Sequence, residues 1–115
     1  MFTEQKFQIG ELVGISAKTV EEHLKLYAGY VKNANMIIEK MATLDSEKDS
    51  YIVSEMFRRF SFEYNGMRNH EVYFATLEGA ATPLNPESEL GKTLLGLFGN
   101  YETFIKEFSA LALTR

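Results

Sequence analysis

The chain has 115 residues, of which 45% are hydrophobic and 24% charged, so it is long enough to bury a core in one compact domain. Its net charge of −4 argues against a nucleic-acid partner, because phosphate binding relies on clustered Lys and Arg, and these are scattered here. The absence of cysteine excludes disulfides, thiolate metal sites and cysteine nucleophiles. With no basic leader segment and no membrane-spanning apolar run, we expect no membrane partner and a cytoplasmic location.

The first 15 residues predict an irregular arm, because two glycines interrupt a stretch whose apolar side chains can pin it to a body. Ser16 is a suitable N-cap for the segment that follows, in which apolar residues recur every three or four positions. We therefore predict a long helix over residues 17–42. The apolar residues of the arm are Phe2, Phe7, Ile9 and Leu12.

The polar run over residues 44–49 predicts a turn. A second helical pattern begins after it, runs from Ile52 to Leu77, and is expected to end near Glu78, before Gly79. Because the linker between the two long helices is short, they are expected to form an antiparallel hairpin.

Two shorter helices are predicted beyond a loop that follows the hairpin. Asn85 is expected to cap the first of them, with Pro86 at its first position and Gly99 at its end. Asn100 caps the last helix, whose apolar pattern runs to Arg115 without a stop signal. Such a pattern predicts that the chain was cut from something longer or that a partner covers its end. The predicted fold class is all-α.

The chain has two histidines, His23 and His70, and both fall on the apolar faces of the long predicted helices. Neutral imidazole is the commonest protein ligand for first-row transition metals, so two on facing helices predict half of a metal shell. The competing interpretation is that each is a hydrogen-bonded core histidine. Similarly, Tyr27 and Tyr30 either offer their hydroxyls to a metal-bound water or simply pack in the core.

Gly66 lies four residues before His70 on the same side of its helix, where a glycine costs about 1 kcal/mol relative to alanine. It either permits close packing against the first helix, for example against Gly29, or leaves room for a group beside the histidine. Other metal motifs are absent. Neither histidine has a Glu three residues before it, as di-iron bundles require, and His70 has no second histidine four residues later, as zinc proteases require.

Residues 69–74 (NHEVYF), 19–35 and 98–108 are three segments that resemble parts of the iron/manganese superoxide dismutases. One is similar to the Asn-His-x-x-Tyr/Phe-Trp/Phe segment that carries a metal-ligand histidine in this family. Another resembles the family's first long helix, in which a ligand histidine precedes a Tyr-Val-x-x-x-Asn run, and the third resembles its Phe-Gly-Ser-x-x-x-Phe-x-x-x-Phe element. The resemblance extends from residue 16 to residue 115.

The resemblance implies a superoxide dismutase that holds one manganese or iron ion, with His23 and His70 as metal ligands. It further implies that Tyr30 is the hydroxyl beside the substrate, superoxide, and that Lys25 or Arg68 attracts this anion. The resemblance also favours manganese, because Gly66 matches the small residue that manganese-type members carry where iron-type members have a glutamine.

The spacing in the first helix departs from the family pattern by one residue. Counting back from Tyr30 places Glu22 at the ligand position, whereas counting forward from Thr19 places His23 there. His23 is preferred because it also lies on the apolar face.

The family's other two ligands come from an Asp-x-Trp-Glu-His motif that this sequence does not contain. By resemblance, residues 1–80 form the N-terminal arm and hairpin, and residues 81–115 the first helices of an incomplete C-terminal α/β domain. Two functions follow. The chain is a truncated or split superoxide dismutase, completed by a homo-oligomer or a complementary C-terminal chain, or it is a non-catalytic helical interaction module on the same scaffold. The unstopped last helix favours the second function and the intact histidines favour the first.

Overall fold

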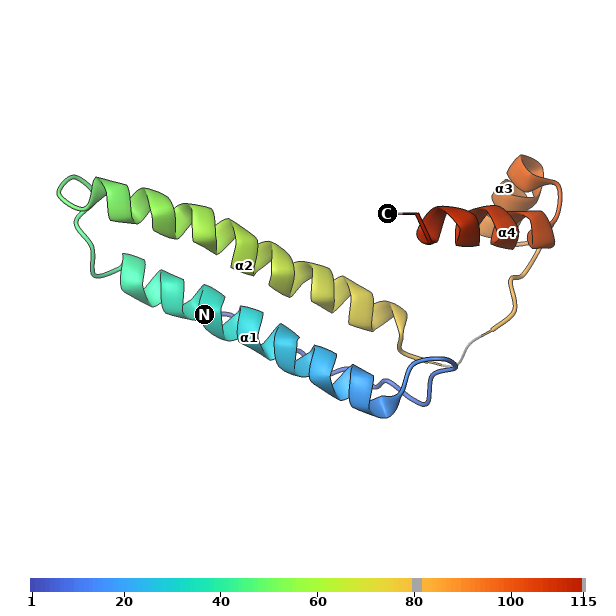
Figure 1. Cartoon of the computed structure of the whole chain (residues 1–115), viewed down its shortest axis with the longest axis horizontal. Coiled ribbons are helices and arrows are strands. Elements are labelled where there is room, and N and C mark those ends of the chain that lie inside the picture. The colour runs from blue at the N-terminus through green and yellow to red at the C-terminus, as the bar shows by residue number, and fades with distance from the viewer. Residues whose placement is uncertain (80–81, 115) are drawn as a thin grey trace. The chain divides into compact units, whose positions relative to one another are not determined.

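The computed structural model describes residues 1–79 and 82–114, which form four α-helices and no β-strand. The predicted all-α class is therefore confirmed. The chain divides into two compact units, Met1–Ala80 and Ala81–Arg115. The first unit contains a long antiparallel hairpin and the second a pair of short helices (Figure 1). The hairpin consists of α1 (Ala17–Met41) and α2 (Ser50–Thr76), and the second unit contains α3 (Glu89–Phe98) and α4 (Tyr101–Ala112).

The ends of the hairpin helices agree with the sequence signals to within two residues. Ser16 caps α1 as predicted, since its hydroxyl accepts the N–H of Thr19 at 3.1 Å. The turn that follows is held by Asp45, whose carboxylate accepts the N–H groups of Glu47 and Lys48, both at 3.0 Å. These two hydrogen bonds stabilise the ionised form and lower the pKa of the Asp45 carboxyl.

A stripe of residues three and four positions apart forms the core between α1 and α2. Tyr27 and Val31 of α1 pack with Met67 and Phe74 of α2, and all four are buried. This is the spacing that places side chains on one face of a helix, so the predicted hairpin buries the face that its pattern indicates.

The N-terminal arm covers this core, as predicted for Phe2, Phe7 and Ile9, which pack against it. Phe7 contacts both helices, because its ring lies 5.9 Å from that of Tyr27 and 5.3 Å from that of Phe74, measured between centroids. Leu12 is half-buried, and its backbone pairs with that of Ile15 in a short turn at the end of the arm.

The arm is also held through its backbone, at every third residue. The acceptors are side chains of α1 and of the residues after α2. The N–H groups of Phe2, Gln5 and Gln8 donate to Asn35 (2.7 Å), Tyr27 (2.9 Å) and Glu78 (2.5 Å).

Helix α3 begins later than predicted, and its N-cap is Ser88 rather than Asn85. Asn85 instead forms a tight turn, in which its carbonyl accepts the N–H of Ser88 at 3.1 Å. That turn packs directly on the helix at Gly91, where an added Cβ would lie 2.1 Å from the Asn85 carbonyl oxygen. Because the Asn85 segment is folded as a turn against Gly91, the helix begins after it and Ser88 serves as the N-cap.

Helix α4 has the predicted N-cap, since Asn100 accepts the N–H of Thr103 at 2.8 Å. It ends at Ala112 instead of continuing to the last residue as predicted. The rings of Phe98 and Phe104, 5.3 Å apart, join α3 to α4. No residue of α4 is buried, so its apolar side chains lie largely at the surface of this unit.

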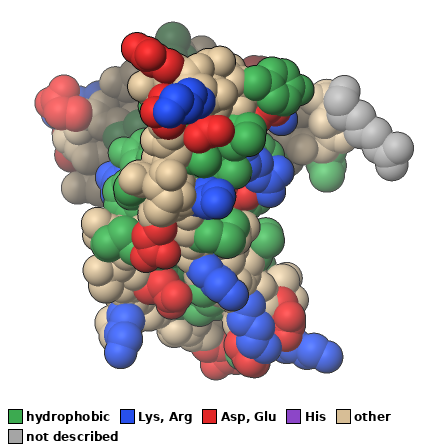
Figure 2. Space-filling model, turned by 90° about the vertical axis from the view of Figure 1, so that its left-hand side faces the viewer, with side chains coloured by type: hydrophobic (Ala, Val, Ile, Leu, Met, Phe, Trp, Pro, Cys, Tyr) green, Lys and Arg blue, Asp and Glu red, His purple; other side chains and the backbone are tan. Residues whose placement is uncertain are grey.

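The charged side chains form no large area of one sign on the face shown in Figure 2, where acidic and basic groups lie among each other. None of the helices within residues 1–79 and 82–114 is both long and apolar enough to cross a membrane.

Candidate metal centre

The hairpin brings the two histidines together near its open end. Their ring centroids lie 4.8 Å apart and their planes are nearly perpendicular, at 82°. Both are partly buried, and the ring of Phe74 lies 5.0 Å from His23 and 6.0 Å from His70. Two nitrogens bound to one metal at about 2.1 Å are at most about 4.2 Å apart, so facing rings are what a shared ion requires.

A hydrogen bond to the backbone fixes the orientation of the His70 ring. Its Nδ1 lies 2.6 Å from the carbonyl oxygen of Gly66, one turn earlier in α2. A carbonyl only accepts, so Nδ1 carries the proton and donates it, which leaves the lone pair on Nε2. Ligand histidines commonly donate their second ring nitrogen to a carbonyl in this way.

The surroundings of His23 favour its neutral form. Burial lowers the pKa of His23, and the proximity of the His70 ring lowers it further. A neutral imidazole is the form that binds metal. The competing residue, Glu22, is 61% exposed at its side chain and accepts a hydrogen bond from Lys25 at 3.0 Å. Of the two residues that the sequence leaves in question, His23 is the one beside His70.

Tyr30 occupies the space that Gly66 leaves free. A Cβ at Gly66 would lie 2.5 Å from two atoms of the Tyr30 ring, and this ring is 5.0 Å from that of His70. Gly66 therefore permits close packing against the first helix, which was one of the two alternatives, but the partner is Tyr30 and not the example Gly29, where a Cβ would meet nothing within 4 Å. The glycine thus makes room for a tyrosine whose ring lies beside the histidine.

The hydroxyl of Tyr27 takes part in a polar link with Glu71 and the N-terminal arm. It donates to Glu71 at 3.1 Å and accepts from the N–H of Gln5 at 2.9 Å. Burial raises the pKa of the Tyr27 hydroxyl, and the Glu71 carboxylate raises it further, so the proton stays in place to be donated. The other carboxylate oxygen of Glu71 is ion-paired with Arg68.

Glu71 is a buried residue that reasoning from the sequence missed. It is only 6% exposed, although it is charged and faces α1. Its position was a usable signal, because Glu71 lies four residues after Met67 and three before Phe74, on the same stripe of α2. A charged residue on an apolar stripe, with an Arg three residues earlier, indicates a paired buried carboxylate.

The two expected anion attractors are both bound to acids. Lys25 pairs with Glu21 at 2.8 Å and with Glu22 at 3.0 Å, and Arg68 pairs with Glu71. Their positive charge is therefore largely balanced within the hairpin.

The described residues contain no group of three or more His, Cys, Asp or Glu side chains arranged to hold a metal ion. A hollow of about 170 Å³ opens beside His23, with Thr19, Tyr73 and Phe74 among its walls. The two imidazoles thus fit half of a metal shell, with adjoining space for further ligands.

Comparison with known families matches residues 12–78 to the alpha-hairpin domain of iron/manganese superoxide dismutases. A mitochondrial manganese superoxide dismutase of Glossina morsitans morsitans is 32% identical over 109 residues, which are 93% of this chain and 50% of that relative. A manganese/iron superoxide dismutase of Propionibacterium freudenreichii subsp. shermanii is 29% identical over 85% of this chain and 50% of its own length. The chain thus spans about half the length of these relatives. No solved structure matches significantly.

Proposed function

This chain belongs to the iron/manganese superoxide dismutase family, and we propose that it supplies two of the metal ligands of such an enzyme, His23 and His70. The observation that carries the proposal is that the ring centroids of the two imidazoles lie 4.8 Å apart, while Nδ1 of His70 is hydrogen-bonded to the Gly66 carbonyl. The reaction would convert two superoxide anions and two protons into oxygen and hydrogen peroxide.

The ion would be manganese or iron, since relatives named for either metal are similar to this chain. A bound manganese or iron ion supplies the reversible one-electron change that dismutation needs. His70 would bind it through Nε2, because Nδ1 is engaged with the backbone. His23 would bind it as a neutral imidazole.

Tyr30 is our candidate for the hydroxyl beside the substrate. Its ring packs on α2 at Gly66, and its centroid lies 6.0 Å from that of the Phe62 ring one turn earlier in α2. This packing fixes the ring next to His70. A phenol held in this position can keep a proton near the reacting oxygen atoms.

A complete site needs further ligands from outside the described hairpin. Two imidazoles leave most positions around a metal ion open. We propose that a second copy of the chain or a complementary C-terminal chain supplies them, with residues 81–115 as the first helices of an α/β domain.

The alternative function is a non-catalytic interaction module on the same scaffold. Exposed apolar side chains on α4 favour it, because Phe108 is 58% exposed and Leu111 is 72% exposed. Contiguous apolar surface of this kind drives association. Sedimentation at micromolar concentration tests it: a strictly monomeric chain would remove its main support.

Metal content and activity test the proposed enzyme function. We would refold the chain with manganese or iron, isolate it by size exclusion, and measure bound metal and superoxide consumption. The expected result is weak metal retention and little activity, with both reduced further in His70→Ala and unchanged in Asn69→Ala, an exposed neighbour. Metal retention that His70→Ala leaves unchanged would contradict the assignment of this ligand.

A further inference from the structure

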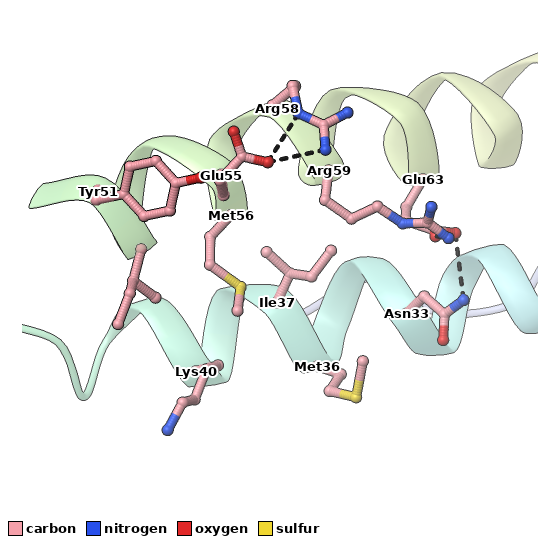
Figure 3. Close-up of a pocket in the computed structure, with 11 residues that line it drawn as sticks. Asn33, Met36, Ile37, Lys40, Tyr51, Glu55, Met56, Arg58, Arg59 and Glu63 are labelled. Atoms are coloured by element: carbon pink, nitrogen blue, oxygen red, sulfur yellow. Dashed lines mark hydrogen bonds and ion pairs between the residues drawn. The ribbon is translucent and has the colours of Figure 1, made fainter. Parts of the chain in front are cut away.

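Two buried glutamates link α2 to α1. Glu63 is 1% exposed and Glu71 is 6% exposed, and burying a carboxylate is costly unless it is paired. Each is ion-paired with an arginine of α2 and accepts a hydrogen bond from a side chain of α1. The first link is Tyr27–Glu71–Arg68, with 3.1 Å between the Tyr27 hydroxyl and Glu71. The second link is Asn33–Glu63–Arg59, with 3.3 Å between the Asn33 amide and Glu63 (Figure 3).

The two links differ in their distance from the histidines. Tyr27 lies one turn after His23 on α1, about 6 Å along the helix axis, and Glu71 directly follows His70. Asn33 lies ten residues after His23, which is about 15 Å along the same axis. The Asn33 link instead borders a groove of about 610 Å³ in the half of the hairpin near the turn (Figure 3).

The link near the histidines is also the more fully bonded one. The Tyr27 hydroxyl donates to Glu71 while it accepts from the N–H of Gln5, so both of its roles are used. The two oxygens of Glu71 are held by different groups, Oε1 by Tyr27 and Oε2 by Arg68. A buried link with every member satisfied resists rotation and sliding of the two helices.

The effect of such a slip on the histidines can be scaled from helix geometry. Moving one helix by a single residue along its axis is a shift of about 1.5 Å. Metal–ligand distances tolerate deviations of only about 0.2 Å. A shift of one helix by a single residue would therefore move one imidazole too far for both rings to bind the same ion.

We propose that Tyr27 and Glu71 are positioning residues of the metal site, whose hydrogen bond sets the register of α1 against α2 and so keeps His23 beside His70. This inference rests on the proposed function, because the register matters to a metal when both imidazoles bind it. Nothing in it requires Tyr27 or Glu71 to touch the ion.

The test compares variants of the two links in the full chain. Tyr27→Phe and Glu71→Leu remove the link near the histidines, whereas Glu71→Gln keeps an acceptor for Tyr27. Asn33→Leu is the matched control, because it breaks the other link between the same helices. The first measurement, without metal, is the nuclear Overhauser effect between the ring protons of His23 and His70. The second is broadening of these signals by added Mn²⁺, which gives an apparent Kd.

We expect Tyr27→Phe and Glu71→Leu to weaken the contact between the rings and to raise the apparent Kd about 10- to 100-fold. Glu71→Gln should stay within a few fold of the unmodified chain. Asn33→Leu should lower the melting temperature but leave the ring contact and the Kd unchanged. If Glu71→Leu does not fold, Tyr27→Phe, which keeps the ring and its packing, decides the result.

Failure of the positioning role can be told apart from failure of the proposed function. Unchanged ring contact and Kd in Tyr27→Phe, with a melting temperature lowered as in the control, would overturn the positioning role. A chain with ring contact but no broadening by Mn²⁺ would contradict the metal site, and loss of the contact in Tyr27→Phe would still support the positioning role. Absence of the contact in the unmodified chain would contradict both.

Discussion

The helices of the two units show the same local sequence signals, but the two units differ greatly in how many side chains their helices bury. The hairpin unit buries Tyr27 and Phe74 under the N-terminal arm, whereas the only buried residue of α3 and α4 in the described part of the second unit is Gly91. Both units have proper N-caps and apolar residues at helical spacing. Caps and periodicity therefore suffice to form helices, but a core needs long faces and a third element to cover them.

The same substitution made in each unit should show the largest difference. Phe74 is fully buried and contacts Phe7, Tyr27 and His23, so Phe74→Ala should lower the free energy of unfolding by about 3–5 kcal/mol. Phe108→Ala should change it by less than about 0.5 kcal/mol, because that side chain is mostly exposed. Chemical denaturation measures both. Similar losses would mean that α4 is covered in solution.

Two glycines of the hairpin should respond to alanine in opposite directions. Gly66→Ala places a Cβ against the Tyr30 ring, and this overpacking should outweigh the gain in helix propensity, for a net loss of about 1–2 kcal/mol. Gly29→Ala meets nothing within 4 Å and should stabilise the hairpin by up to about 1 kcal/mol. Thermal unfolding of both variants measures the difference, and a stabilised Gly66→Ala would show that Tyr30 is free to move.

The second unit offers a matching pair of glycines on α3. Gly91→Ala would drive a Cβ into the backbone of the Asn85 turn, and we expect it to cost about 1–3 kcal/mol, expressed as faster amide exchange in α3. Gly96→Ala meets nothing within 4 Å and should slow that exchange slightly. Amide exchange in α1 and α2 should stay the same in both variants, and a change there would mean that the two units are coupled.

The smallest effect is expected in the turn of the hairpin, and it depends on pH. The pKa of Asp45 is lowered in the folded chain, so its contribution is fully present above the ordinary value of 3.8 and is lost as the pH falls through the folded value. The amides of Glu47 and Lys48 should therefore lose protection in that acidic range, after correction for intrinsic exchange. Asp45→Ala should remove this dependence. Unaltered protection at low pH would show that the turn holds without the carboxylate.

Features that rest on local signals were predictable from the sequence. Ser16 and Asn100 cap their helices as expected, because a cap needs only the side chain and the next three residues. The start of α3 was not predictable in this way. Asn85 and Ser88 are both good cap residues, and the choice between them depends on the contact of the turn with Gly91.

In the candidate site, too, features with a local sequence signal were predictable and features that depend on contacts between helices were not. The apolar stripes place His23 and His70 on facing helices, and the two rings do lie beside each other. The burial of Glu63 and Glu71 was missed, although each lies on the apolar stripe of α2 with an arginine three or four residues earlier. Their hydrogen-bond partners on α1, Asn33 and Tyr27, carry no such local signal. Likewise, nothing local to Gly66 indicates that its neighbour is the ring of Tyr30 rather than Gly29.

Part of the attachment of the arm is made by its main chain, and this has a consequence for how its sequence can vary. The donors at Phe2, Gln5 and Gln8 are backbone N–H groups, which every residue except proline provides. Many substitutions at Gln5 and Gln8 should therefore leave these hydrogen bonds in place, whereas proline at either position should release the arm locally. In a set of related chains, positions 5 and 8 would diverge in side chains while still avoiding proline, whereas positions 2, 7 and 9 would stay apolar.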